Sequence, residues 1–210
     1  GDDDITRFSE SIARALKTVS LTVPIYFIHV NRDFAIRQSF AARAGMTILP
    51  EQHVIDLYGR KALLMHGDEL CTRDIEYQKF RKKSRSWWWP RLMLLLPLKT
   101  RQKMANNGRQ VSKNNQKQLT AEIMDVTQSE VELAMRRHGA DLLIHGHTHR
   151  PKVHTFTLDN RLMKRIVLGD WYDQGSILIA DKQHLSLESR AFQLIEVIYT
   201  QLSPCELPSD

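Results

Sequence analysis

Histidines alternate in the segment His145-Gly146-His147-Thr148-His149, which directly follows the apolar run from Asp141 to Ile144. Alternate side chains of an extended chain point to the same side, so two imidazoles two residues apart can face one ion. Imidazole suits manganese, iron and zinc, and the glycine between the histidines lets a cation or a phosphate approach the backbone. Taken alone, however, this motif favours a histidine-rich polar loop over a metal site.

Two further motifs shift the interpretation toward a metal site. His66-Gly67-Asp68 is expected at the exit of a strand, and so is His29-Val30-Asn31-Arg32-Asp33. The amide oxygen of Asn31 can bind a hard cation, and the guanidinium of Arg32 can hold a phosphate oxygen. Separately, the first motif favours a histidine bound to a backbone carbonyl and the second a turn or helix cap. Because ligands gather at the carboxyl ends of strands in open α/β sheets, the three motifs together favour one site.

The elements that must position these motifs follow from periodicity and turn residues. Apolar residues at helical spacing predict an opening amphipathic helix, and short apolar runs predict strands. We expect helices over Ile5–Val19, up to Ala44 before Gly45, over Asp74 to about Gln118, and over Ser129–Arg137, with strands over Pro24–Ile28, Val54–Tyr58, Ala62–Met65, Asp141–Ile144, Val153–Leu158, Arg165–Leu168 and Ser176–Ile179. The turn of the hairpin is expected at Gly59-Arg60. Mixed strands and helices predict a layered α/β fold in which residues 1–210 form one domain, with a helical insertion at about 74–118.

Composition limits the class of protein. The chain has 210 residues, 42% of them hydrophobic, and a formal net charge of +6, which favours an anionic partner such as nucleic acid, phospholipid headgroups or a phosphorylated substrate. The two cysteines, Cys71 and Cys205, form no paired motif, which argues against a disulfide framework or a cysteine zinc site. The acidic start is unlike a secretory signal, and the most apolar segment, Trp87–Leu98, falls short of the ~20 residues of a membrane span. We expect a protein that is soluble or lies on a membrane surface.

The three motifs and their surroundings resemble a known family. Calcineurin-like metallophosphoesterases carry, in order, a D-x-H motif, a G-D motif, a G-N-[HR]-[DE] motif, a histidine after a strand, and a terminal G-H-x-H. The chain resembles the UDP-2,3-diacylglucosamine diphosphatase branch of this family from residue 1 to about residue 180. The matching segments are His29 to Phe34, Met65 to Asp68, Leu70-Cys71-Thr72, Asp74, Tyr77, Ile123 to Val126, Ile144 to Pro151 and Val167 to Trp171.

The resemblance implies a fold and a set of site residues. The fold would be a calcineurin-like layered β-sandwich with flanking helices and a helical insertion cap. The metal ligands would be Asn31, His66, His145 and His147, with Asn31 and His66 on one ion and His147 on the other. The catalytic residues would be Asn31 and His145. The residues that contact the substrate would be Asn31, Arg32, Asp74, Asn114, Lys117 and His145. For Asp74 and Lys117 the residues by themselves favour an ordinary solvated helix face.

The resemblance also implies a reaction and a location. Two manganese ions would activate water for attack on the α-phosphorus of UDP-2,3-diacylglucosamine, giving UMP and 2,3-diacylglucosamine 1-phosphate in lipid A biosynthesis. The protein would be a monomer on the cytoplasmic face of the inner membrane, and no nucleic-acid partner is expected. A different metallophosphoesterase activity and a non-catalytic lipid-binding role stay open as alternatives. Nucleic-acid binding ranks below both, because the sequence has no recognisable nucleic-acid-binding module.

The sequence departs from the family pattern in two places. In the family, the D-x-H strand and the strand before the G-D motif precede the segment that begins this chain, so we expect an N-terminally truncated fold without two aspartates and a histidine of the ligand set. Val30 stands where the family has glycine, and a β-branched residue would be strained there if the position needs a positive φ. Both departures predict weakened metal binding and low activity.

The insertion has an unusual composition. From Arg81 to Lys103 it combines three consecutive tryptophans, many leucines and eight basic residues, and it contains no acid. Tryptophan, leucine and cations suit a surface that contacts anionic lipid while the charges stay in water. The continuous apolar run also fits a pair of core helices. We prefer a lid that receives acyl chains and rests on the membrane, since the resembling family places its acyl-binding cap here.

Overall fold

A mixed five-stranded sheet is the centre of the molecule. The computed structural model describes residues 6–30, 33, 36–116, 123 and 125–192. The sheet has the order β3-β4-β5-β7-β6, formed by Gln52–Leu57, Arg60–Met65, Leu142–His145, Arg161–Val167 and Lys152–Leu158. β4, β5 and β7 are parallel, while β3 and β6 run antiparallel to their neighbours at the two edges. The three central strands therefore end at the same edge of the sheet.

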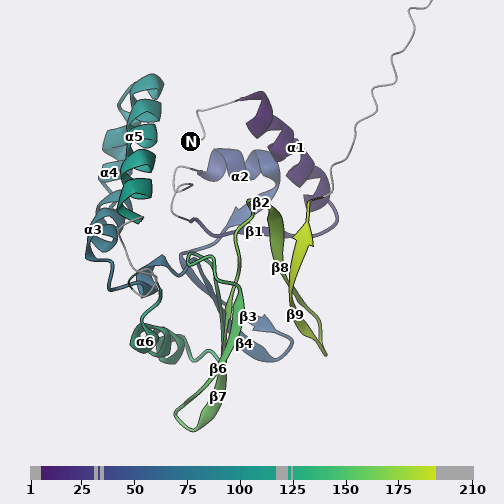
Figure 1. Cartoon of the computed structure of the whole chain (residues 1–210). Helices are drawn as coiled ribbons and strands as arrows, with labels where there is room; N and C mark the ends of the chain where they lie inside the picture. The colour runs from purple at the N-terminus through teal and green to yellow at the C-terminus, as the bar shows by residue number, and fades with distance from the viewer. Residues whose placement is uncertain (1–5, 31–32, 34–35, 117–122, 124, 193–210) are drawn as a thin grey trace, which may run out of the picture.

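Each face of this sheet is covered by a different layer. On one face, Leu63 and Leu143 pack with Val131 and Met135 of helix α6 (Gln128–His138), and all four are buried. On the other face, leucines of the antiparallel hairpin β8 (Gln174–Ala180) and β9 (Leu185–Ala191) pack over the cluster of Ala62, Leu142 and Ile166. The chain is thus a layered mixed α/β protein with flanking helices (Figure 1).

The N-terminal helices and a small sheet form a separate group at the top of Figure 1. Helix α1 (Arg7–Ser20) begins at Thr6, whose hydroxyl accepts a hydrogen bond from the backbone of Ser9. Strand β1 (Ile25–Phe27) pairs in parallel with β2 (Met46–Ile48), and helix α2 (Gln38–Ala44) lies between them in sequence. The helix ends at Gly45, as predicted, because glycine adopts the left-handed cap conformation readily.

The described residues between β4 and α6 are mainly helical, as predicted for the part from Asp74 to Gln116. A short 3-10 turn, η1 (Asp68–Leu70), is followed by α3 (Ile75–Ser84), α4 (Trp89–Leu94) and α5 (Leu98–Gln116). In Figure 1 these three helices stand on one side of the molecule, away from β8 and β9. Among the described residues, no helix combines the length and the apolar character needed to cross a bilayer.

Four details differ from the sequence prediction. The hairpin turn lies at Tyr58-Gly59, one residue earlier than expected; both residues have positive φ, and Gly59 donates its N–H to Asp56. The apolar run Pro24–Ile28 suggests a buried strand, but Tyr26 of β1 is exposed, because β1 pairs only with three-residue β2 in the described part of the chain. β2 and β9 were not predicted at all. β9 nevertheless carries a period-2 pattern, with Leu185 and Leu187 facing the core.

Candidate functional site

The candidate site lies where β4 and β5 end. β4 leads into His66-Gly67, and β5 ends at His145 and leads into the loop from Gly146 to His149. The two loops are tied together, because the N–H of Gly146 donates to the carbonyl oxygen of His66 at 3.0 Å. Because neighbouring parallel strands bring their carboxyl ends to one edge, residues about 80 positions apart in sequence become neighbours here.

His66 and His147 form a close pair at this edge. Nε2 of His66 lies 3.1 Å from Nδ1 of His147, and the two rings meet edge to face with centroids 4.9 Å apart. Two nitrogens bound to one cation at about 2.0–2.1 Å, with angles of about 90–109°, lie about 2.8–3.4 Å apart. The separation therefore fits a shared divalent cation, and it also fits a hydrogen bond between the rings when one nitrogen carries a proton.

Burial keeps both imidazoles neutral. Burial, together with the neighbouring His147, lowers the pKa of His66 to about 3. Burial also lowers the pKa of His147, against an opposing effect of Asp68. Neutral imidazole is the form that binds metals, so the pair is poised as a nitrogen donor set at neutral pH.

His145 occupies a different place from this pair. Its side chain is buried; Nδ1 lies 2.9 Å from the carbonyl oxygen of Gly146, and Nε2 lies 3.4 Å from the guanidinium of Arg165. The ring also packs directly against Gly67. Burial lowers the pKa of His145 to about 4. In this arrangement His145 supports the loop that carries His66, and its role as a ligand stays a prediction.

The remaining predicted ligand and its neighbour, Asn31 and Arg32, lie outside the described residues. Within the described part of the chain, no group of three or more histidine, cysteine, aspartate or glutamate side chains is arranged to hold a metal. His66 and His147 thus fit part of a ligand set, and Asn31 is the candidate third member. The division of the ligands between two ions stays a prediction.

Two hydrogen bonds hold the segment that precedes Asn31. Nε2 of His29 lies 2.7 Å from the carbonyl oxygen of Ile36, and the N–H of Val30 donates to the carboxylate of Asp33 at 2.6 Å. Val30 is not among the described residues with positive φ. A β-branched side chain is therefore accommodated at this position without left-handed strain.

The predicted substrate contacts fall in or beside the insertion. Asp74 is the N-cap of α3, where its carboxylate accepts a hydrogen bond from the N–H of Tyr77 at 3.0 Å. The backbone of Asn114 lies in α5, but its side chain is outside the described part of the structure, and Lys117 is outside it entirely. Asp74 therefore has a structural role at the start of the insertion whether or not it contacts substrate.

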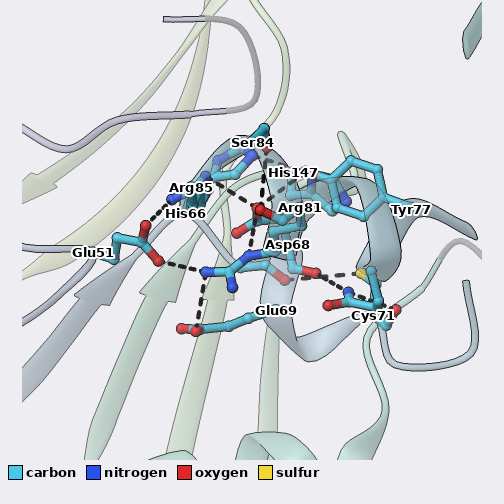
Figure 2. A network of polar contacts seen from close by, with 12 residues as sticks. Glu51, His66, Asp68, Glu69, Cys71, Tyr77, Arg81, Ser84, Arg85 and His147 are labelled. Carbon is cyan, nitrogen blue, oxygen red and sulfur yellow. Dashed lines mark hydrogen bonds and ion pairs between the residues drawn. The ribbon is translucent and has the colours of Figure 1, made fainter. Parts of the chain in front are cut away.

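A charged network beside the histidine pair was not predicted (Figure 2). The buried carboxylate of Asp68 accepts hydrogen bonds from Tyr77, Arg81 and Arg85, all on α3 or at its C-terminal end. Burial alone would raise the pKa of Asp68, but the attraction of Arg85 and Arg81 outweighs it and lowers the pKa. Helical spacing places residues 77, 81 and 85 on one face, so the sequence held a signal that this face binds an acidic partner. It did not identify the partner.

The sequence of the chain is similar to those of several known proteins. It matches none of the models of known protein families. It is 48% identical over 191 residues to a UDP-2,3-diacylglucosamine hydrolase of Aeromonas salmonicida, covering 90% of this chain and 75% of that protein. Proteins of the same name from Vibrio atlanticus and Coxiella burnetii are 43% and 45% identical over 193 and 194 residues; the matches cover 91% and 92% of this chain and 79% of each relative.

Proposed function

This chain belongs to the UDP-2,3-diacylglucosamine hydrolase family, and we propose that it hydrolyses the pyrophosphate bond of UDP-2,3-diacylglucosamine. The products would be UMP and 2,3-diacylglucosamine 1-phosphate, in the pathway to lipid A. The observation that carries the proposal is that His66 and His147, from two motifs 81 residues apart, meet at 3.1 Å in a chain so similar to these hydrolases. Finer features of the fold, a calcineurin-like β-sandwich capped by the insertion, are part of the proposal.

We propose manganese as the cofactor, bound as two ions, with Asn31 and His66 on one ion, His147 on the other and His145 as a further ligand. When bound, it would supply Lewis-acid stabilisation of charge on the phosphoryl oxygens. The neutral state of the two imidazoles supports this role, because each has a lone pair for a cation at neutral pH. Arg32 would neutralise charge on the pyrophosphate, and the buried His145 would hold the ligand loop from behind.

The test is hydrolysis of UDP-2,3-diacylglucosamine in manganese-containing buffer made with ¹⁸O-labelled water. Attack at the α-phosphorus places the label in UMP, whereas attack at the other phosphorus places it in the lipid phosphate. His147→Ala should abolish turnover, because it removes one of the two convergent nitrogens. Leu162→Ala, on an exposed tip, is the control and should retain it. Absence of turnover by the unaltered chain, with UDP-N-acetylglucosamine and other nucleotide diphosphates hydrolysed instead, would replace the proposed substrate.

The insertion is the surface that we propose for the membrane. Trp87 is 76% exposed and Leu95 is 82% exposed, and both lie within the basic segment Arg81–Lys103. Large exposed apolar side chains flanked by cations suit an anionic lipid interface. The protein would therefore lie, as a monomer, on the cytoplasmic face of the inner membrane, with acyl chains received by the insertion and with Asp74, Asn114 and Lys117 near the glucosamine.

Vesicle binding tests this surface. Replacing Trp87 and Leu95 with serine should weaken binding to vesicles that contain phosphatidylglycerol, and raised salt should weaken it further because the cations are screened. Leu162→Ser is the matched control, since it removes an exposed leucine that belongs to β7 and not to the insertion. Equal loss of binding in the control and the double variant would contradict a localised surface.

A further inference from the structure

Asp68 is a carboxylate that the fold removes almost completely from water. Its relative exposure is 1%, and it lies two residues after His66. A buried carboxylate is strongly unfavourable unless it is paired and hydrogen-bonded. The donors and cations that offset the cost of removing this carboxylate from water therefore determine where Asp68 lies.

Those partners come from a single helix. The hydroxyl of Tyr77 donates to Oδ2 of Asp68 at 3.0 Å, Nε of Arg81 donates to it at 2.9 Å, and the guanidinium of Arg85 lies 3.1 Å from it. The side-chain amide of Gln78 adds a bond to the backbone carbonyl of Asp68 at 2.7 Å. Side chains from one face of α3 and from its C-terminal end thus converge on the carboxylate of Asp68 (Figure 2).

An outer layer of carboxylates holds the two arginines in place. Glu51 pairs with both Arg81 and Arg85, and Glu69 pairs with Arg81 at 3.3 Å. Glu69 also accepts a hydrogen bond from the side chain of Gln52, at the start of β3. The insertion is consequently anchored to the sheet through the same loop that carries His66.

Tyr77 extends this anchor to the second histidine. Its ring centroid lies 5.4 Å from that of His147, while its hydroxyl is bound to Asp68. A movement of α3 would therefore displace a side chain that touches both Asp68 and the His66–His147 pair. A displacement of about 1 Å at reacting groups can lower a rate about 100-fold.

We infer that Asp68 and Tyr77 are positioning residues, which couple the placement of helix α3 to the orientation of the His66–His147 pair. The inference rests on the proposed function only in treating this pair as the reactive centre. It requires no contact between Asp68 and the substrate. A change in the position of α3 would then change the relative orientation of the His66 and His147 rings.

The decisive variants are Tyr77→Phe, which removes only the hydroxyl, and Arg81→Gln, which removes one guanidinium. Lys79→Gln is the control, because it removes a positive charge from the same helix at an exposed ion pair outside the network. Three measurements apply to each: hydrogen exchange of residues 75–84, ¹⁵N NMR signals of the His66 and His147 rings, and kcat and KM for UDP-2,3-diacylglucosamine.

We expect about tenfold faster exchange in α3, shifted ring signals of His147, and kcat reduced about 10- to 100-fold with a smaller change in KM. Arg81→Lys should recover part of each effect, and Lys79→Gln should show none. Faster exchange without any change in the histidine signals or kcat would overturn the coupling, because Asp68 would then serve stability alone. If the unaltered chain shows no hydrolysis, the proposed function fails, while the exchange and NMR measurements still decide this inference.

Discussion

Gly67 offers the most direct test of the packing behind the histidine pair. It adopts φ +100°, and a Cβ at this position would lie 2.6 Å from Nδ1 of His145. An L-residue in a left-handed conformation costs about 1–2 kcal/mol. The buried imidazole of His145 cannot move away easily, since its nitrogens contact the Gly146 carbonyl and Arg165. Overpacking of this kind adds about 1–3 kcal/mol.

We therefore expect Gly67→Ala to lower the free energy of unfolding by about 2–5 kcal/mol. Two other glycines separate the contributions. Gly59 has φ +86° with no atom within 4 Å of an added Cβ, so Gly59→Ala should cost the conformational part alone, about 1–2 kcal/mol. Gly108 lies in α5 in equally open space, so Gly108→Ala should stabilise the helix by about 0.5–1 kcal/mol.

Urea unfolding followed by far-ultraviolet circular dichroism measures all three variants. The amount by which Gly67→Ala lowers the free energy of unfolding more than Gly59→Ala does is attributed to the contact with His145. This difference should become smaller when both glycine variants are made in a His145→Ala background, where the ring is absent. Equal midpoints for Gly67→Ala and Gly59→Ala would refute the reasoning, because the contact with His145 would then contribute nothing.

Three further predictions concern single side chains, two of them buried and one exposed. Burial raises the pKa of Cys71 to about 12. In a Cys205→Ser background, the Cys71 thiol should therefore resist Ellman's reagent at pH 8 until urea is added. The contribution of the neutral thiol to the free energy of unfolding is complete below about pH 8.5 and is lost as pH rises toward 12. Leu143→Ala, at a fully buried position, should reduce the free energy of unfolding by about 2–5 kcal/mol in urea titrations, with exposed Leu162→Ala nearly unchanged. Arg136→Ala removes only an exposed ion pair, and no shift in the unfolding midpoint is expected.

Local signals in the sequence were sufficient for most elements of the fold. Gly45 and Gly139 both end helices in the left-handed conformation, so these boundaries follow from the residue type. The convergence of His66 and His147 was also predictable, because apolar runs before both motifs indicated strands whose ends could meet. Their roles as ligands stay predictions, and Asn31 lies outside the described residues.

Long-range charge pairing was not predictable from local patterns. Arg81 and Arg85 read as part of a solvated basic face, yet both are largely buried against Asp68 and Glu51. Whether a cation on a helix meets water or a carboxylate depends on the packing of α3 against the loop after β4. Periodicity specifies a face of the helix, but it does not specify what the face contacts.

The observed backbone conformation of the loop from Gly146 to His149 is intrinsically unfavourable. His147 and His149 both have positive φ, at 67° and 54°, and each such residue costs about 1–2 kcal/mol. At acidic pH the burial of His147 beside His66 adds a second cost, because it disfavours protonation of both imidazoles. Contacts between this loop and its neighbours must offset these costs. The N–H of Gly146 donates to the carbonyl oxygen of His66, and Tyr77 of α3 packs against His147. Loosening α3 should therefore let the loop relax toward negative φ, which would separate the two imidazoles before the sheet itself unfolds.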